Sequence, residues 1–260
     1  NEVIEQLRDG IRTLLSQPNI TLVEGSAEFV DAHTIKVGDE LFTADNIIIA
    51  TGSHTKLPPF AVEGMQSAKT KVVTSTELLD IESVPPTLAI VGAGVIGMEF
   101  ASAFNTFGSK VDVYEFLPEC LPAIDKDIAR RLRKSLEKRG VKFHMKYSVG
   151  NVDDLGADVV LIATGRAANT DGLALEKAGI SYDRKGITVD DNMLTNVAGV
   201  YAVGDVNGRS MLAHAAEWQG RRAVNHIIGE HDDIRFDIMP SAIFTYPEAA
   251  CVGPAESVLK

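Results

Sequence analysis

Apolar residues recur along the chain in two alternating patterns. Residues 2–16 carry them at helical spacing, which predicts an amphipathic helix. Residues 20–43 suit short strands that are interrupted at Gly25 and Gly38. Three further short, wholly apolar runs end in glycine or Gly-Asp, which is typical of parallel strands covered on both faces. These runs are residues 46–52, 158–165 and 200–205.

A regular alternation of strands and helices follows the Pro-rich loop at residues 84–87, which predicts a domain boundary there. The expected strands are residues 88–91, 111–115 and 141–144, and the expected helices are residues 95–107 and 125–139. Asp125 can cap the second helix, and its apolar stripe is Ile128, Leu132 and Leu136. This order predicts an α/β fold with mostly parallel sheets.

Composition narrows the function classes. The 260 residues suffice for one large or two small domains, and the 36 acidic residues outnumber the 25 basic ones. We therefore expect no nucleic-acid partner, and we interpret the basic run at residues 130–134 as a solvated helix face. No apolar run approaches the roughly 18 residues of a membrane span, and no signal peptide opens the chain, so we expect no membrane partner and a cytoplasmic location. Because the first residue is Asn1, we expect the natural protein to begin upstream.

The strongest chemical signal is a G-x-G-x-x-G turn between a strand and a helix. Gly92 permits the tight turn, Gly94 lets the backbone approach a pyrophosphate, and Gly97 lets the helix pack on the strand. The free N–H groups of the helix N-terminus would face the anion. Glu115 follows 23 residues after Gly92 and can accept ribose hydroxyls. Its charge would repel a 2′-phosphate, so the pattern favours NAD over NADP.

Two Ala-Thr-Gly sequences and one Gly-Asp end apolar strands, at Gly52, Gly165 and Asp205. Ligands of open α/β sheets lie at such carboxyl ends. Asp205 can hydrogen-bond a polyol chain, or it can simply form a turn. The helix that follows residues 211–214 could direct its free N–H groups at an electron-rich ring edge.

The order of these motifs resembles the FAD-dependent pyridine nucleotide–disulfide oxidoreductases, and within them the dihydrolipoamide dehydrogenases. The segments that carry the resemblance are residues 47–53, 91–100, 121–128, 163–170, 202–205, 211–217 and 244–250. The resemblance implies a Rossmann-like NAD-binding domain inserted in an incomplete FAD-binding domain. The NAD-binding domain would be residues 83–165, the FAD-binding parts 1–82 and 166–237, and the start of the interface domain 238–260.

The resemblance also implies roles for individual residues. The residues that would hold NAD are Gly92, Ala93, Gly94, Val95, Ile96, Gly97, Glu99, Glu115, Val149 and Gly165. The residues that would contact FAD are Ala27, Thr51, Gly52, Ser53, Asp205, Met211, Leu212, Ala213 and His214. The implied reaction oxidises protein-bound dihydrolipoamide and reduces NAD through FAD and a redox disulfide. The implied partners are the lipoyl-bearing carrier proteins of 2-oxo acid dehydrogenase complexes or of the glycine cleavage system, and a second subunit in a homodimer.

The chain departs from this family in what it lacks. Its two cysteines, Cys120 and Cys251, are 131 residues apart, whereas the family's redox pair is separated by four residues. We interpret both as buried or incidental thiols and expect no metal site. The His–Glu base of the interface domain is also absent, so we expect no catalytic residues and no catalysis in this chain alone. We also expect weak or absent FAD binding and a weakened dimer.

One internal segment is short as well. The family has a longer antiparallel β-meander in the region of residues 141–158, so here its hairpins are reduced or residues are missing.

Three alternatives to a dihydrolipoamide dehydrogenase stay open. The first is another family member, such as an NADH oxidase, a coenzyme A disulfide reductase, or a glutathione or mercuric reductase. The second is a nucleotide-binding module without redox chemistry, and the third is a purely structural α/β domain.

Overall fold

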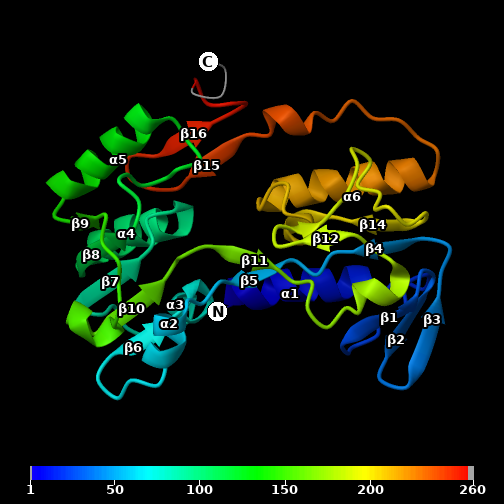
Figure 1. The fold of residues 1–260 in the computed structure, drawn as a ribbon, viewed down its shortest axis with the longest axis horizontal. Coiled ribbons are helices and arrows are strands. Elements are labelled where there is room, and N and C mark those ends of the chain that lie inside the picture. Colours follow the sequence, from blue (N-terminus) through cyan, green and yellow to red (C-terminus); the bar gives the residue numbers. More distant parts are fainter. Residues whose placement is uncertain (1, 257–260) are drawn as a thin grey trace.

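The computed structural model describes residues 2–256 and shows two α/β parts side by side (Figure 1). One part contains a five-stranded parallel sheet, and the other contains a parallel strand pair and a three-stranded antiparallel sheet. The antiparallel ribbon of β5 (Ser53–Thr55) and β11 (Arg166–Ala168) runs between them. The predicted α/β fold with a Rossmann-like parallel sheet is confirmed. Among the described residues, no helix has the length and apolar character to span a bilayer.

The five strands of the parallel sheet lie in the order β6-β10-β7-β8-β9. They are β6 (Lys71–Val73), β7 (Thr87–Val91), β8 (Lys110–Glu115), β9 (Lys142–Met145) and β10 (Val159–Ile162). Every residue of β10 is buried, as expected for an inner parallel strand. The sheet also takes in β6, which precedes the expected boundary at residue 83 and pairs with β10.

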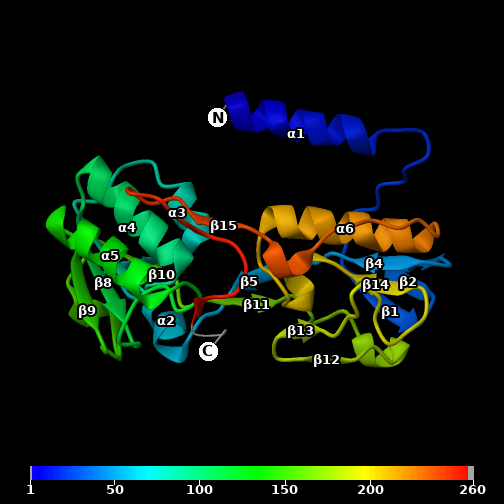
Figure 2. The same ribbon diagram turned by 90° about the horizontal axis from the view of Figure 1, so that it is seen from above.

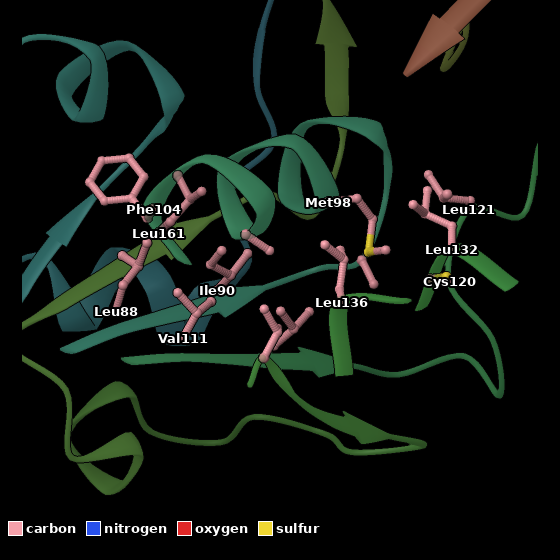
Figure 3. Close-up of a cluster of buried hydrophobic side chains, with 14 of the residues drawn as sticks. Leu88, Ile90, Met98, Phe104, Val111, Cys120, Leu121, Leu132, Leu136 and Leu161 are labelled. Carbon is pink, nitrogen blue, oxygen red and sulfur yellow. The ribbon is translucent and has the colours of Figure 1, made fainter. Parts of the chain in front are cut away.

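Two helices cover one face of this sheet, α4 (Val95–Phe107) and α5 (Lys126–Lys138). Their buried side chains form one cluster with those of β7, β8 and β10 (Figure 3). Two details of the expected second helix are wrong. Its buried stripe contains Ala129 in place of Ile128, which is 37% exposed. Asp125 is the N-cap residue but makes no side-chain cap; its Oδ1 accepts the backbone N–H of Glu256 at 3.0 Å.

The connection between β9 and β10 forms no antiparallel hairpin, so the expected β-meander is reduced. It contains only the 3₁₀ turn η1 (Val152–Leu155), which packs on α2 (Pro59–Gly64). Val152 is buried in a cluster with Ala61 of α2. These two segments cover the sheet face opposite α4, and the short helix α3 (Ser75–Leu79) follows β6.

The second part of the chain has a parallel pair and an antiparallel sheet. The parallel pair is β4 (Ile47–Ile49) and β14 (Val200–Ala202), and the antiparallel sheet is β1 (Ala27–Asp31), β2 (Thr34–Val37) and β3 (Glu40–Thr43). The strand expected from residue 20 therefore begins only at Ala27; residues 20–24 are exposed and have no strand beside them in the described chain. The smaller elements are η2 (Leu175–Ala178), β12 (Tyr182–Asp183), β13 (Gly186–Ile187) and η4 (Phe236–Ile238).

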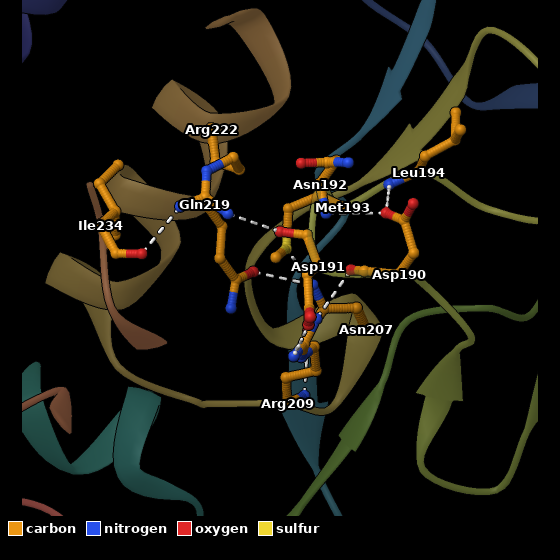
Figure 4. Close-up of polar contacts among 10 residues, drawn as sticks. All are labelled: Asp190, Asp191, Asn192, Met193, Leu194, Asn207, Arg209, Gln219, Arg222 and Ile234. Carbon is orange, nitrogen blue, oxygen red and sulfur yellow. Dashed lines mark hydrogen bonds and ion pairs between the residues drawn. The ribbon is translucent and has the colours of Figure 1, made fainter. Parts of the chain in front are cut away.

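Helix α6 (Ala213–Ile227) packs over the turn that follows β14. Its buried Gln219 accepts the backbone N–H of Gly204 at 2.7 Å and the Nδ2–H of Asn207 at 2.8 Å. Arg222 on the same helix donates to Asp232 and to the carbonyls of Asp191 and Ile234 (Figure 4 labels Arg222, Asp191 and Ile234). The bonds of Gln219 fix the turn η3 (Gly204–Asn207), which contains Asp205, against α6, and those of Arg222 attach the segments of Asp191 and of Asp232 to Ile234 to the same helix.

Helix α1 (Glu2–Leu15) confirms the expected amphipathic helix but has no buried residue. Figure 2 shows it apart from the rest of the chain, above α6 in that view and joined by a long connection. Its apolar side chains Val3, Leu7 and Leu14 are each more than 60% exposed. Its sequence therefore has the pattern of a packed helix, but within the described chain nothing covers its apolar face.

Candidate dinucleotide-binding site

The glycine turn after β7 is shaped by two close approaches. Gly92 has φ +106°, and a Cβ there would lie 2.3 Å from the carbonyl oxygen of Ala163. A Cβ on Gly97 would lie 2.0 Å from the carbonyl oxygen of Gly92. By contrast, a Cβ on Gly94 would meet no heavy atom within 4 Å. The first and third glycines thus serve packing inside the protein, and the second leaves open space beside the turn.

That open space belongs to a pocket of about 500 Å³. Five of the ten predicted NAD-binding residues line it: Gly92, Gly94, Glu115, Val149 and Gly165. The other five lie in the turn and α4 behind the lining, with Ala93 and Gly97 buried. Gly94 is the N-cap residue of α4, and no side chain caps this helix. The first N–H groups of α4 therefore remain available to an anion in the pocket.

Sequence reasoning missed most of the remaining lining, which comes from four separate segments. The missed residues are Pro58, Phe60, Tyr114, Phe116, Leu117, Pro122, Tyr147 and Ser148. The aromatic residues next to Glu115 could have been suspected from the sequence, because they flank the residue that is predicted to bind the ribose. Phe60 could not, because only the packing of α2 beside the sheet brings it there.

The carboxylate of Glu115 lies at the end of β8 beside the glycine turn. Its Oε2 accepts the backbone N–H of Ala93 at 2.6 Å, and its Oε1 accepts that of Leu117 at 2.7 Å. A carboxylate has about four acceptor positions, so each oxygen can still accept a hydroxyl. The arrangement thus presents a fixed negative charge with free acceptor capacity to the pocket.

A cluster of three aromatic side chains lies next to Glu115, where β8 and β9 run side by side. The rings of Tyr114 and His144 are stacked, with centroids 4.4 Å apart and planes at 8°. Tyr147 lies against Tyr114, with centroids 5.2 Å apart. Burial, together with the nearby carboxylate of Asp112, raises the pKa of Tyr114.

Glu99, expected beside the nicotinamide, lies on α4 outside the lining of this pocket. Its Oε1 accepts the backbone N–H of Phe244 at 2.8 Å. Phe244 follows β15 (Ser241–Ile243), which pairs with β16 (Ala249–Cys251), and Ile243 is buried in the cluster under α4. Glu99 therefore helps to attach the start of the expected interface domain to the parallel-sheet part.

The predicted FAD residues lie in the second part and along the β5–β11 ribbon. The Ser53 hydroxyl donates to Asp205 Oδ2 at 2.5 Å, and Arg166 Nε donates to the Ser53 oxygen at 2.6 Å. Thr51 donates to the carbonyl of Asn169 at 2.8 Å. These contacts bring the Ala-Thr-Gly-Ser segment and the Gly-Asp turn together, although they are about 150 residues apart.

Other predicted FAD residues lie at separate places in this part. Ala27 and Thr51 line a small hollow of about 110 Å³ over β1, β2 and β4. Leu212 is the N-cap residue of α6, and no side chain caps that helix either. The ring of His214 is engaged, because its Nε2 lies 2.7 Å from the carbonyl oxygen of Pro240.

Both cysteines are free thiols. Cys120 is 1% exposed, and burial raises the pKa of its thiol to about 12. It therefore has almost no thiolate at neutral pH and is a poor nucleophile. The expectation of a buried thiol is confirmed for Cys120, whereas Cys251 is only partly buried.

Comparison with known proteins identifies the family to which the chain belongs. The model of the pyridine nucleotide-disulphide oxidoreductase family matches residues 2–220. The chain belongs to this family. Its members are flavoproteins that depend on FAD and a pyridine nucleotide. The resemblance noted in the motifs is confirmed.

The relatives at the sequence level include several dihydrolipoyl dehydrogenases. The chain is 37% identical to the mitochondrial dihydrolipoyl dehydrogenase 1 of Arabidopsis thaliana over 285 residues, covering 100% of this chain and 55% of that protein. It is 40% identical to the dihydrolipoyl dehydrogenase of Acholeplasma laidlawii over 241 residues, covering 87% of this chain and 70% of that protein. The chain thus spans little more than half the length of the plant relative.

A solved structure with a similar fold is the HOCl-induced flavoprotein disulfide reductase RclA from Escherichia coli, in its Cu(II) complex. The two chains superpose with a TM-score of 0.89 at 31% sequence identity. The match covers 100% of this chain and 63% of the other. The parts described above therefore occur together in a longer flavoprotein.

Proposed function

We propose that this chain binds NAD in the pocket between the glycine turn and Glu115. The observation that carries the proposal is the open space beside Gly94 at the uncapped N-terminus of α4. The first N–H groups of α4 would hold the pyrophosphate there. Glu115 would accept the hydroxyls of the adenosine ribose, and Val149 and Gly165 would contact the adenosine side.

The chemistry of this site is redox chemistry. When bound, NAD supplies a ring that accepts or donates a hydride. The chain's own residues bind and orient the dinucleotide: backbone N–H groups hold its phosphates, and the Glu115 carboxylate holds a ribose. Glu99 would lie on the nicotinamide side, from where its contact with Phe244 connects the site to β15.

We further propose that residues of the second part contact FAD in the whole protein. The residues in question are Ala27, Thr51, Gly52, Ser53, Asp205 and the backbone of 211–214. The held carboxylate of Asp205 and the uncapped start of α6 support this assignment. A glycine turn for the FAD pyrophosphate is not among these 260 residues, so we expect weak or no flavin binding by this chain. A purified sample with stoichiometric flavin absorbance would contradict that expectation.

For the whole protein we propose the activity of a dihydrolipoyl dehydrogenase. The identity to the Arabidopsis and Acholeplasma proteins supports this proposal. The proposed partners are lipoyl-bearing carrier proteins and a second subunit. The chain alone should not reduce NAD with dihydrolipoamide, because its two cysteines cannot form the redox pair. A cytoplasmic location also stays a prediction, since the Arabidopsis relative is named as mitochondrial.

A second candidate is another flavoprotein disulfide reductase of the same family. The similarity to the Escherichia coli reductase, at 31% identity over the whole of this chain, favours it. The two candidates differ in the segment that carries the redox cysteines and in the substrate. Activity of the whole protein with dihydrolipoamide would support the first candidate, and activity only with other disulfides would support the second.

Calorimetric titration of this chain with NADH and NADPH tests the cofactor assignment. We expect NADH to bind more tightly, because the Glu115 carboxylate repels a 2′-phosphate. Equal affinity for the two would contradict the role of Glu115. Absence of binding by both would refute the proposed site.

A further inference from the structure

Two tyrosines and a histidine meet at the edge of the dinucleotide pocket. Tyr114 and Tyr147 both line the pocket, beside Val149. His144 lies parallel to Tyr114 at 4.4 Å, and Tyr147 lies at 58° to Tyr114 with centroids 5.2 Å apart. The rings of Tyr147 and His144 are also edge to face, 6.3 Å apart.

The backbone holds Tyr147 next to the proposed ribose ligand. Its N–H donates to the carbonyl oxygen of Glu115 at 2.9 Å, and the N–H of Lys146 donates to that of Leu117 at 3.1 Å. Lys146 has φ +58°, a left-handed conformation that a residue other than glycine rarely adopts. This turn ends the pairing of β9 with β8 and directs the chain from Tyr147 to Val149 along the pocket.

The other two rings support Tyr147 from behind. His144 Nε2 lies 2.7 Å from Asp112 Oδ1, which fixes the imidazole under Tyr114. Tyr114 packs in the cluster that η1 and α2 complete over the sheet. Tyr147 is 43% exposed and lines the pocket, whereas His144, of which the side chain is 38% exposed, does not line it. An aromatic ring that is supported on one side and open to a ligand pocket is suited to stacking a planar group.

The neighbours of Tyr147 indicate which part of a dinucleotide that planar group would be. In the proposed NAD site Gly94 would lie beside the pyrophosphate and Glu115 would hold the adenosine ribose, and Tyr147 lies next to Glu115, whose carbonyl accepts its N–H. We infer that Tyr147 contacts the adenine ring of the bound dinucleotide, with Tyr114 and His144 as its support. This inference rests on the proposed NAD site and assigns it a specificity-determining residue.

The test uses this chain, with NADH and ADP-ribose as probes and calorimetric titration as the measurement. Tyr147→Ala should weaken the binding of both probes about tenfold, since stacking of a base on an aromatic ring contributes about 1–3 kcal/mol and 1.4 kcal/mol is a factor of ten. Tyr147→Phe should bind both probes within about twofold of the unmodified chain, because it keeps the ring. Tyr182→Ala is the matched control, since Tyr182 is 49% exposed on β12 and does not line the pocket.

Each outcome has one meaning. Equal weakening of both probes by Tyr147→Ala, with binding kept in Tyr147→Phe and in the control, supports the inference, because ADP-ribose keeps the adenosine and pyrophosphate of NADH and lacks only the nicotinamide ring. Unchanged binding in Tyr147→Ala overturns it, as does weakening for NADH only. Tyr147→Leu keeps an apolar side chain without a ring, and unmodified affinity in that variant also overturns it. If the unmodified chain binds neither probe, the proposed NAD site itself fails.

Discussion

Gly94 and Gly97 should respond oppositely to the same substitution. Alanine at Gly94 adds a methyl group to open space, because no heavy atom lies within 4 Å of its Cβ position. Alanine at Gly97 places the same methyl group 2.0 Å from the carbonyl oxygen of Gly92. Both variants have the same composition and the same helix, so they form a matched pair.

The expected magnitudes follow from these contacts. Gly97→Ala forces a backbone shift, and overpacking of this kind costs about 1–3 kcal/mol. Gly94→Ala should cost about 1 kcal/mol at most, because alanine is a poorer N-cap residue than glycine. Its methyl group would instead hold a pyrophosphate away from the N–H groups of α4. Each charge-assisted hydrogen bond lost there is worth about 1.5–3 kcal/mol, which corresponds to roughly 10- to 150-fold in affinity.

Urea unfolding and NADH calorimetry on both variants separate the two effects. Gly94→Ala should unfold near the midpoint of the unmodified chain and bind NADH at least tenfold more weakly. Gly97→Ala should unfold at clearly lower urea. If Gly94→Ala binds NADH as the unmodified chain does, the pyrophosphate does not lie beside Gly94. If Gly97→Ala unfolds like the unmodified chain, the close approach inferred at Gly92 does not constrain the turn.

Three further substitutions test other contacts. Glu115→Ala should weaken NADH binding by about 1–3 kcal/mol and also lower stability, since it leaves two backbone N–H groups without an acceptor. Glu115→Gln should lower stability less, because its single amide oxygen can still accept one of the two; equal unfolding midpoints for the two variants would contradict this reasoning. In the Cys251→Ser variant, Cys120 should not react with a thiol reagent at pH 8 until urea unfolds the chain, because burial raises its thiol pKa to about 12; rapid labelling of the folded chain would disprove this. Hydrogen bonds from Arg222 lower the pKa of Asp232, so its contribution to stability is present above about pH 4, the unfolded value, and decreases as the pH falls further. Asp232→Asn should therefore lower the free energy of unfolding by about 1–3 kcal/mol at pH 7 and much less at pH 2, and an equal loss at both pH values would argue against the ion pair.

Several features of this chain could be predicted because their causes are local. The glycine turn and Glu115 are recognisable from residue types at fixed spacing within one strand–turn–helix–strand unit. The bounds of α4 follow from the apolar run that Gly94 and Gly108 enclose, and the structure has the helix at Val95–Phe107. Buried parallel strands were equally visible, because wholly apolar runs ending in glycine occur where both faces of a strand are covered.

Other features depended on which segments meet in space. The register of β8 with β9 pairs Tyr114 with His144, and no periodicity along either strand indicates that pair. The pairing of β6 with β10 moved the edge of the parallel sheet before the expected boundary at residue 83. Asp125 was expected to cap α5 from its position, but its Oδ1 instead accepts the backbone N–H of Glu256, more than 100 residues away in the chain.

Helix α1 distinguishes what the sequence determines from what the tertiary structure determines. The sequence by itself determined that residues 2–15 form a helix with one apolar face, because periodicity and helix propensity act within a few turns. Only the tertiary structure decided that this face is uncovered in the described chain, while the equally amphipathic α5 buries Leu132 and Leu136 against the sheet. An apolar face is buried only where another part of the chain packs against it. The hydrophobic pattern shows that such a face exists, but not which segment covers it. The same reason explains why the glycine turn could be found from the sequence, whereas the place of Phe60 in the pocket lining could not.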